Sequence, residues 1–266
     1  MKKYYSPVGM AFLLVTSFLF SACSKLRDYI IQHPDDIGKH CKIETLAFTS
    51  TGMATAHARF IYNGSGEPQE LLPDFMYGPD LHFRYDKKGR LSDVLQTDPG
   101  GTFVYLWSIY TYPSARVIID SIYEYQGNVN DPHPPGQPDL TVRIVKMQLD
   151  DFGRPVKFLA YTSDPRDPPN SFDETYDRNG NLVIAGAVYD NKINIYQTSK
   201  TWQLYFLEYS RNNRMSPPGL PATPAAYNTN GLPTRFLGPS WSIFGFAFNT
   251  MDVTYACDVS MGGTSY

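Results

Sequence analysis

The chain has few of the residues by which metal proteins and thiol enzymes are recognised. Its 266 residues include three cysteines, none of them in a Cys-x-x-Cys pair. The five histidines show no spacing typical of metal ligands; they are His33, His40, His57, His82 and His133. The sequence therefore predicts no metal and no other cofactor.

Basic charge is also scarce. Lys and Arg number 23 against 26 Asp and Glu, which gives a net charge of −3. The charge becomes more negative if a leader carrying Lys2 and Lys3 is removed. No stripe of cations is left that could follow a phosphate backbone. We therefore expect no nucleic-acid partner.

Long apolar runs are missing, and a short one lies near the start. Residues 8–20, "VGMAFLLVTSFLF", would span only about 20 Å as a helix, less than the ~30 Å of a hydrocarbon core. Lys2 and Lys3 precede the run, and the small residues Ser21 and Ala22 follow it. This order is typical of a secretory signal. We predict that residues 1–22 are a signal peptide.

The end of this run, "FSAC" at 20–23, resembles the lipobox of bacterial lipoproteins, although Phe20 stands where that family usually has an aliphatic residue. The resemblance implies cleavage before Cys23, lipidation of its thiol and a tether over residues 23–40. Ser24 in place of Asp implies the outer membrane, on either of its faces. The alternative is an ordinary signal peptide in front of a chance cysteine.

Two cysteines remain, Cys41 and Cys257, near opposite ends of the chain. An oxidising compartment permits a disulfide between them. Such a bridge would close a very long loop, which the loop-entropy model values at about 5 kcal/mol. The alternative is two buried free thiols.

A helical period of 3.6 is absent from every stretch longer than about ten residues. Strand-like alternation or β-rich runs occur instead, at 41–48, 103–112, 115–125, 140–149, 155–163, 202–210 and 244–259. Aromatic residues, which pack well on a pleated sheet, make up 15% of the chain. We predict one all-β domain over residues 41–266.

One short phrase occurs repeatedly. "YDKKGRL" at 85–91 has relatives at 62–68, 149–155, 176–182, 209–215, 227–233 and, less closely, 125–131. An early Asp or Asn can accept hydrogen bonds from backbone N–H groups two or three residues on, and a later Gly supplies a positive φ. The phrase thus predicts a hairpin turn. The predicted turn residues are Tyr62, Gly66, Tyr85, Asp86, Gly89, Asp150, Gly153, Tyr176, Asp177, Gly180, Tyr209, Asn213 in place of Gly, Tyr227 and Gly231.

The phrase resembles the YD repeat of Rhs and teneurin-type proteins, in which "YDxxGRL" turns join successive strands. The copies cover most of residues 60–235. The chain is also similar to uncharacterised Gram-negative lipoproteins that carry a segment like "YDNKINIY…WQLYFLEYSRNN" (189–213). These resemblances imply a scaffold of β-repeats. We predict an antiparallel meander of hairpin repeats in a long twisted sheet that can close in part. The resemblances imply no activity.

No arrangement of side chains predicts catalysis. His40 and Cys41 are neighbours on a strand, so their side chains point to opposite faces. Residues 177–181 resemble the start of a calcium loop, but no carboxylate follows at 184–188. Asp150 and Asp151 diverge in a turn, whereas a glycosidase needs two carboxyl groups facing one bond.

Aromatic side chains are the remaining feature with functional content. On an exposed strand face, Tyr and Trp can stack on sugars or anchor a peptide; the alternative is that they fill the core. The candidates are Tyr105, Trp107, Tyr110, Tyr112, Trp202, Tyr205 and Trp241. We predict a non-catalytic binding or scaffold module with a glycan or an envelope protein as partner. The alternatives are an enzyme acting on polysaccharide or peptide, and a structural spacer without a ligand.

Overall fold

A computed structural model describes residues 41–49, 54–74, 78–125, 140–163, 168–215 and 223–257. The predicted signal peptide, the lipidation site Cys23 and the tether lie outside these ranges, as do residues 126–131 of the least similar copy of the phrase. No helix among the described residues is both long and apolar enough to span a membrane.

Thirteen strands form one sheet in which every pair of neighbours is antiparallel, so the predicted all-β class is confirmed. The strand order is β10-β9-β8-β7-β6-β5-β4-β3-β2-β1-β15-β14-β13. The strands are β1 (Cys41–Thr49), β2 (Ala56–Tyr62), β3 (Pro68–Pro73), β4 (Asp80–Tyr85), β5 (Leu91–Thr97), β6 (Val104–Ser114), β7 (Val117–Tyr125), β8 (Leu140–Leu149), β9 (Pro155–Thr162), β10 (Asn170–Asp173), β13 (Thr223–Tyr227), β14 (Pro233–Ile243) and β15 (Phe246–Cys257).

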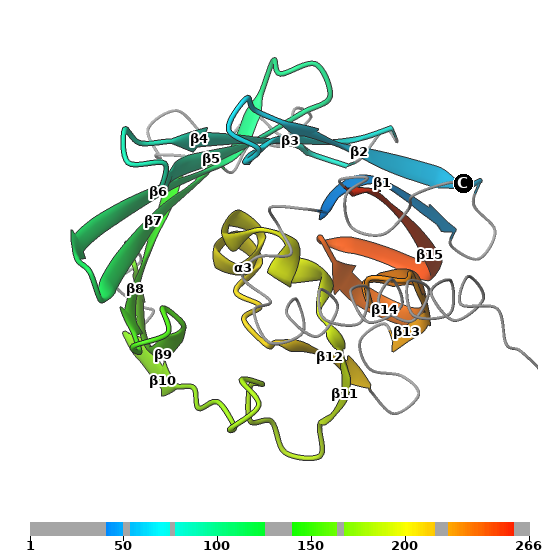
Figure 1. The fold of residues 1–266 in the computed structure, drawn as a ribbon. Coiled ribbons are helices and arrows are strands. Elements are labelled where there is room, and N and C mark those ends of the chain that lie inside the picture. The colour runs from blue at the N-terminus through cyan, green and yellow to red at the C-terminus, as the bar shows by residue number, and fades with distance from the viewer. Residues whose placement is uncertain are drawn as a thin grey trace, which may run out of the picture.

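The sheet curls into an incomplete ring around a short helical segment (Figure 1). This segment consists of η2 (Ile195–Thr198) and α3 (Lys200–Phe206). A separate two-stranded sheet of β11 (Val188–Ile193) and β12 (Asn212–Met215) lies between the edge strands β10 and β13. The ring therefore has a concave face that packs on the helical segment and a convex outer face.

Copies of the phrase occupy alternate connections of the meander. In an antiparallel meander successive turns lie at opposite ends of the strands, so a motif that recurs every second turn stays at one end. The turns after β2, β4, β8 and β13 hold four copies, and β1 begins and β15 ends at the same end. The fifth turn, 177–180, lies next to the turn that follows β8, since Gly180 lies beside the Arg154 side chain. We call this end of the ring the repeat rim.

Five copies close their turn in the same way. At the second copy, Asp86 N–H donates to the Arg90 carbonyl (2.8 Å) and Gly89 N–H donates to the Asp86 carbonyl (2.9 Å). The Asp86 carboxylate also accepts from the N–H groups of Lys88 and Arg90, at 2.8 and 3.0 Å. The same backbone bonds and the same side-chain acceptor recur in the turns that begin at Asn63, Asp150, Asp177 and Asn228.

The copy at 209–215 forms no such turn, so the prediction for Asn213 is wrong. Asn213 is a buried residue of strand β12. Its side-chain amide donates to Asp190 Oδ2 and to the Ile193 carbonyl, both at 3.1 Å. These bonds hold the segment against β11, where a strand satisfies more of its backbone groups than a turn would.

Tyrosine hydroxyls join neighbouring segments along the repeat rim. In four cases the acceptor is the carbonyl of the last residue of a phrase, the Leu or Pro that opens the return strand. The bonds are Tyr85–Pro68 (2.5 Å), Tyr112–Leu91 (2.8 Å), Tyr189–Leu182 (2.6 Å) and Tyr255–Pro233 (2.7 Å). The repeat is thus a turn together with a docking point for the next hairpin.

Replacing Tyr112 by Phe removes one of these bonds and is expected to lower the free energy of unfolding by about 0.5–1.5 kcal/mol. The matched control is Tyr105→Phe, whose hydroxyl makes no hydrogen bond with the described residues and should change stability by less than about 0.5 kcal/mol. Urea denaturation measures both. Equal effects of the two substitutions would contradict the role given to the Tyr112 hydroxyl.

The helical segment corrects the prediction of a strand at 202–210. Ser199 caps α3 by accepting from Thr201 N–H (3.1 Å), and Leu207 ends the helix with a left-handed φ of 52°. A helix of seven residues is too short for a 3.6 period to stand out from a β-rich apolar run. Its side chains Trp202 and Leu204 are buried against the concave face of the sheet.

Candidate functional site

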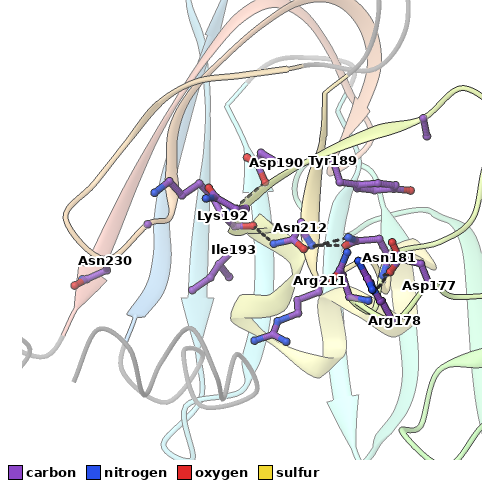
Figure 2. Close-up of a pocket in the computed structure, with 14 residues that line it drawn as sticks. Asp177, Arg178, Asn181, Tyr189, Asp190, Lys192, Ile193, Arg211, Asn212 and Asn230 are labelled. Atoms are coloured by element: carbon purple, nitrogen blue, oxygen red, sulfur yellow. Dashed lines mark hydrogen bonds between the residues drawn. The ribbon is translucent and has the colours of Figure 1, made fainter. Parts of the chain in front are cut away.

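A polar pocket of ≈ 580 Å³ opens on the repeat rim, between the 177–180 turn, strand β11 and the 228–231 turn (Figure 2). The volume falls in the range usual for small-molecule sites. Amide, carboxylate and cationic side chains line most of it. Those used below are Asp177, Arg178, Asn179, Asn181, Tyr189, Asp190, Asn191, Lys192, Asn212 and Asn230.

Asp190 in this pocket is fully engaged by the fold. Its Oδ1 accepts from the N–H groups of Lys192 (2.9 Å) and Asn213 (3.1 Å). Its Oδ2 accepts from the Asn213 amide (3.1 Å) and from the Tyr227 hydroxyl. Burial, reinforced by this carboxylate, raises the pKa of Tyr227 above its usual range. All four acceptor positions of Asp190 are used, so its role is to join β11, β12 and β13.

Two asparagines form the fixed inner wall of the pocket. Asn181 Nδ2 donates to Asn212 Oδ1 (3.1 Å), and Asn212 N–H donates back to Asn181 Oδ1 (2.8 Å). Asn212 Nδ2 also donates to the Lys192 carbonyl (2.9 Å), as Figure 2 shows. Asn181 is only 2% exposed. A pair satisfied in this way is held in one orientation and gives the pocket a rigid base.

Asp177 differs from the equivalent residues of the other Asp turns. Asp86 and Asp150 each pair through Oδ2 with an arginine four residues later, at 2.6 Å in both turns. At the 177–180 turn that position is Asn181, which is turned toward Asn212. The second oxygen of Asp177 accepts no hydrogen bond within the described part of the chain. A carboxylate oxygen therefore lines the pocket with its acceptor capacity free.

Four other polar side chains of the pocket also have no partner among the described residues. The side chains of Asn179, Asn191, Arg178 and Lys192 make no hydrogen bond or ion pair with any residue that the structure describes. They supply acceptors and both neutral and cationic donors around one space. The ring of Tyr189 adds an apolar wall. Such a surface can bind a ligand rich in hydroxyl groups.

Two cysteines lie beside the pocket, and the sequence left open whether they form a disulfide or stay as free thiols. Cys41 and Cys257 are opposite each other on β1 and β15, and they form a disulfide. Asn230, from the 228–231 turn, places its Nδ2 3.5 Å and 3.6 Å from the two Sγ atoms. The bridge thus joins the first and last strands beside the turn that closes the pocket.

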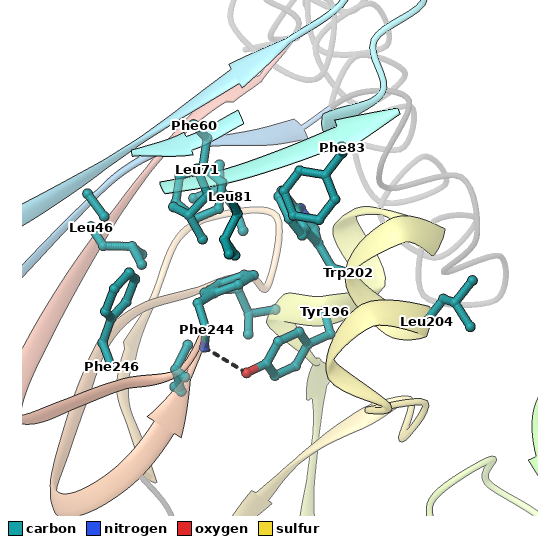
Figure 3. Packing of buried hydrophobic residues seen from close by; sticks show 14 of the residues in the cluster. Leu46, Phe60, Leu71, Leu81, Phe83, Tyr196, Trp202, Leu204, Phe244 and Phe246 are labelled. Carbon is teal, nitrogen blue, oxygen red and sulfur yellow. Dashed lines mark hydrogen bonds between the residues drawn. The ribbon is translucent and has the colours of Figure 1, made fainter. Parts of the chain in front are cut away.

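The predicted aromatic binding face does not form. Alternation along β6 turns Tyr110 and Tyr112 to the concave side and Tyr105 and Trp107 to the convex side. Trp202 is fully buried, with Phe60, Phe83 and Phe244 packed edge-on around it at 5.1–5.4 Å, as Figure 3 shows. Four candidates therefore belong to the interior. They are Tyr110, Tyr112, Trp202 and Tyr205.

On the convex face, Tyr105 is 41% exposed and Trp107 is half-buried. Trp107 donates to Asp93 Oδ1 (3.2 Å) and packs on Tyr123 with a centroid distance of 5.9 Å. The side chain of Trp241 lies outside the described residues. The six described candidates are therefore divided between two faces and make no single surface.

The pocket residues were not predicted as a site, because the sequence places them in a turn, two strands and a second turn. A signal was nevertheless present: "GN" at 180–181 stands where the 85–91 and 149–155 copies have "GR". No group of three or more His, Cys, Asp or Glu side chains within the described ranges could hold a metal ion. The 177–181 segment serves as a turn.

One buried carboxyl group lies away from the pocket, on the concave face. Asp120 of β7 is 9% exposed and stands opposite Tyr110 of β6. Burial raises the pKa of Asp120 to about 7, while Tyr110, Arg143 and Ser108 act to lower it. This carboxyl group is therefore protonated in the folded state at pH values where the unfolded chain has lost the proton.

Because the pKa of Asp120 is raised in the folded state, its contribution to stability is lost as pH rises from about 4 to about 7. Between pH 5 and pH 8 this loss amounts to roughly 2–3 kcal/mol. Asp120→Asn should abolish this pH-dependent loss of stability. The free energy of unfolding of the variant should therefore rise relative to that of the wild type as pH rises. Denaturant unfolding at both pH values measures the difference; parallel pH profiles would contradict the assignment.

Comparison with known proteins places few constraints on the chain. No protein-family model matches it. No curated protein matches it either. Among solved structures, a porin-like protein from Bacteroides vulgatus is similar over 80% of this chain and 97% of that chain, with 14% sequence identity and a TM-score of 0.37.

Proposed function

We propose that this chain is a non-catalytic binding module of the cell envelope that holds a short glycan in the polar pocket. The observation that carries the proposal is that the pocket combines a fixed base with unpaired polar side chains around it. Its base of Asp190, Asn181 and Asn212 is fixed by internal hydrogen bonds, while the side chains around it remain free to bind.

The free groups suit sugar hydroxyls. A hydroxyl both donates and accepts, so it is bound best where an acceptor and a donor lie side by side. Asp177 provides an acceptor, and Arg178 and Lys192 provide donors around the same space. Hydrogen bonds to charged groups are stronger than neutral ones, and each such bond contributes about 1.5–3 kcal/mol.

Binding is favoured over catalysis for a specific reason. Glycoside hydrolysis needs two carboxyl groups that face one bond. The pocket holds two carboxylates, but Asp190 uses all its acceptor positions within the fold. Asp177 then has no free partner carboxylate among the residues that line the pocket.

We also propose that the chain carries a lipid anchor on Cys23. We further propose that it belongs to the lipoproteins with YD-like repeats. The 23–41 segment, fully extended, spans at most about 65 Å. Since Cys41 lies on the repeat rim, the anchor would keep the pocket within that distance of the outer membrane. This location favours an envelope glycan as the ligand.

The binding test uses the chain from residue 24 onward with its disulfide intact, titrated by calorimetry with a panel of neutral and acidic oligosaccharides. Asp177→Asn keeps the turn, because Asn63 and Asn228 serve in the same role, but removes the carboxylate charge. It should weaken binding at least tenfold. The matched control is Asp86→Asn, the same change in an equivalent turn away from the pocket, which should leave binding unchanged.

Two results would count against the binding proposal: no oligosaccharide of the panel binds the folded protein, or Asp177→Asn and Asp86→Asn behave alike. The anchor is tested separately by Cys23→Ala in cells of the source organism. The variant should move from the membrane fraction to the soluble fraction, and retention in the membrane would refute lipidation at Cys23.

A further inference from the structure

A second pocket, of ≈ 310 Å³, lies on the repeat rim. It is bounded by the 86–89 and 150–153 turns, helix α3 and the concave face of β6 and β7. Its described lining shares no residue with the polar pocket. At ~30 Å³ per water molecule, the space equals about ten waters, which is enough for a ring with a short chain.

The interior of this second pocket is apolar. Leu91, Ile118 and Leu204 line it with side chains that are 4%, 7% and 8% exposed. The rings of Tyr112 and Tyr209 form further walls. A wall of this composition favours an apolar ligand body, because covering it removes apolar surface from water.

Phe152 lies at the mouth of this pocket and is 83% exposed. Its backbone N–H donates to Asp150 Oδ1 (2.9 Å), and the Arg154 guanidinium lies over its ring, 4.9 Å from the ring centroid. In the other four turns the same position is polar: Ser65, Lys88, Asn179 and Asn230. An aromatic ring placed in water at the mouth of an apolar pocket indicates a surface that a ligand covers.

Two opposite charges line the same pocket without meeting. The Glu67 carboxylate and the Lys200 ammonium make no ion pair with each other and no hydrogen bond with the described residues. Burial raises the pKa of Glu67, while the positive charges of Lys200 and Lys42 act to lower it, so Lys200 lies near this carboxylate without pairing with it. The Tyr209 hydroxyl also has no hydrogen-bond partner among the residues described.

We propose that this second pocket binds an apolar α-amino acid as its zwitterion. Lys200 receives the carboxylate and Glu67 receives the ammonium group. The rings of Phe152, Tyr112 and Tyr209 surround the side chain. The arrangement satisfies both unpaired charges at once, which a ligand with a single charge cannot do.

L-Phenylalanine and L-leucine are the probes, titrated by calorimetry against the disulfide-intact chain. Both should bind, whereas glycine, 3-phenylpropanoate and 2-phenylethylamine should bind at least tenfold more weakly than L-phenylalanine. Glu67→Gln should reduce the affinity for L-phenylalanine about tenfold without weakening the affinity for 3-phenylpropanoate. Lys200→Gln should also reduce the affinity for L-phenylalanine about tenfold, without weakening the affinity for 2-phenylethylamine.

Phe152→Ser should weaken L-phenylalanine binding, and the matched control Lys88→Ser, at the same position of the neighbouring turn, should not. Unchanged thermal unfolding shows that each variant is folded. The proposal is overturned if neither amino acid binds the folded wild type, if 3-phenylpropanoate binds as tightly as L-phenylalanine, or if neither charge substitution changes the affinity. Asp177→Asn should have no effect, which separates this site from the glycan site.

Discussion

Replacing both Cys41 and Cys257 by Ala is expected to lower the free energy of unfolding by up to about 5 kcal/mol. The bridge joins residues 216 positions apart, so its loss frees almost the whole described chain in the unfolded state. The backbone pairing of β1 with β15 stays possible in the folded state. The effect should therefore appear as lost stability with the fold retained.

Guanidinium denaturation of the double variant, followed by circular dichroism, measures this change. The matched control is the wild type under a reducing agent, which should reach the same midpoint because it lacks the same covalent bond. Alanine is preferred to serine, since Cys41 is fully buried and a serine hydroxyl would be desolvated there. A loss below about 1 kcal/mol would contradict the stabilisation that is assigned to the bridge.

Replacing Trp202 by Ala is expected to cost about 3–5 kcal/mol. Trp202 is the fully buried ring that fixes the helical segment inside the curled sheet, against Phe60 and Phe83 of the sheet and Phe244 of the β14–β15 turn (Figure 3). A seven-residue helix is not stable by itself in water. Without this ring, α3 loses its main anchor.

Trp107→Ala is the matched control, because it removes the same side chain from the convex face. Trp107 is half-buried, and its loss should cost clearly less, about 1–2 kcal/mol. Denaturant unfolding compares the two, and near-UV circular dichroism reports whether the interior remains packed. Similar losses from both variants would contradict the anchoring role of Trp202.

The predictable part of the fold is local. Strand alternation and the Asp–Gly spacing of the phrase are properties of a few adjacent residues, and they indicated the all-β class and the turns at 86–89 and 150–153. The disulfide was one of two open alternatives, because the pairing of β1 with β15 depends on how the sheet curls. Asn213 was misassigned since its partner, Asp190, is 23 residues away.

The candidate site depends on contacts that a single sequence does not display. Asp177, Asn191 and Asn230 belong to three separate segments, and only the curled sheet brings them around one pocket. The aromatic face failed for a related reason. Alternation on β6 fixes which rings share a face, but only the position of α3 decides that Tyr110 and Tyr112 lie on the covered side.

Hydrogen–deuterium exchange of the disulfide-intact chain, with and without the tightest-binding oligosaccharide of the panel, tests the central claim most directly. The account predicts slower exchange confined to the 177–181 turn, strand β11 and the 228–231 turn, and loss of that protection in Asp177→Asn. Protection of strands β6 and β7 instead, or no change in exchange anywhere, would contradict the assignment of the polar pocket as the binding site.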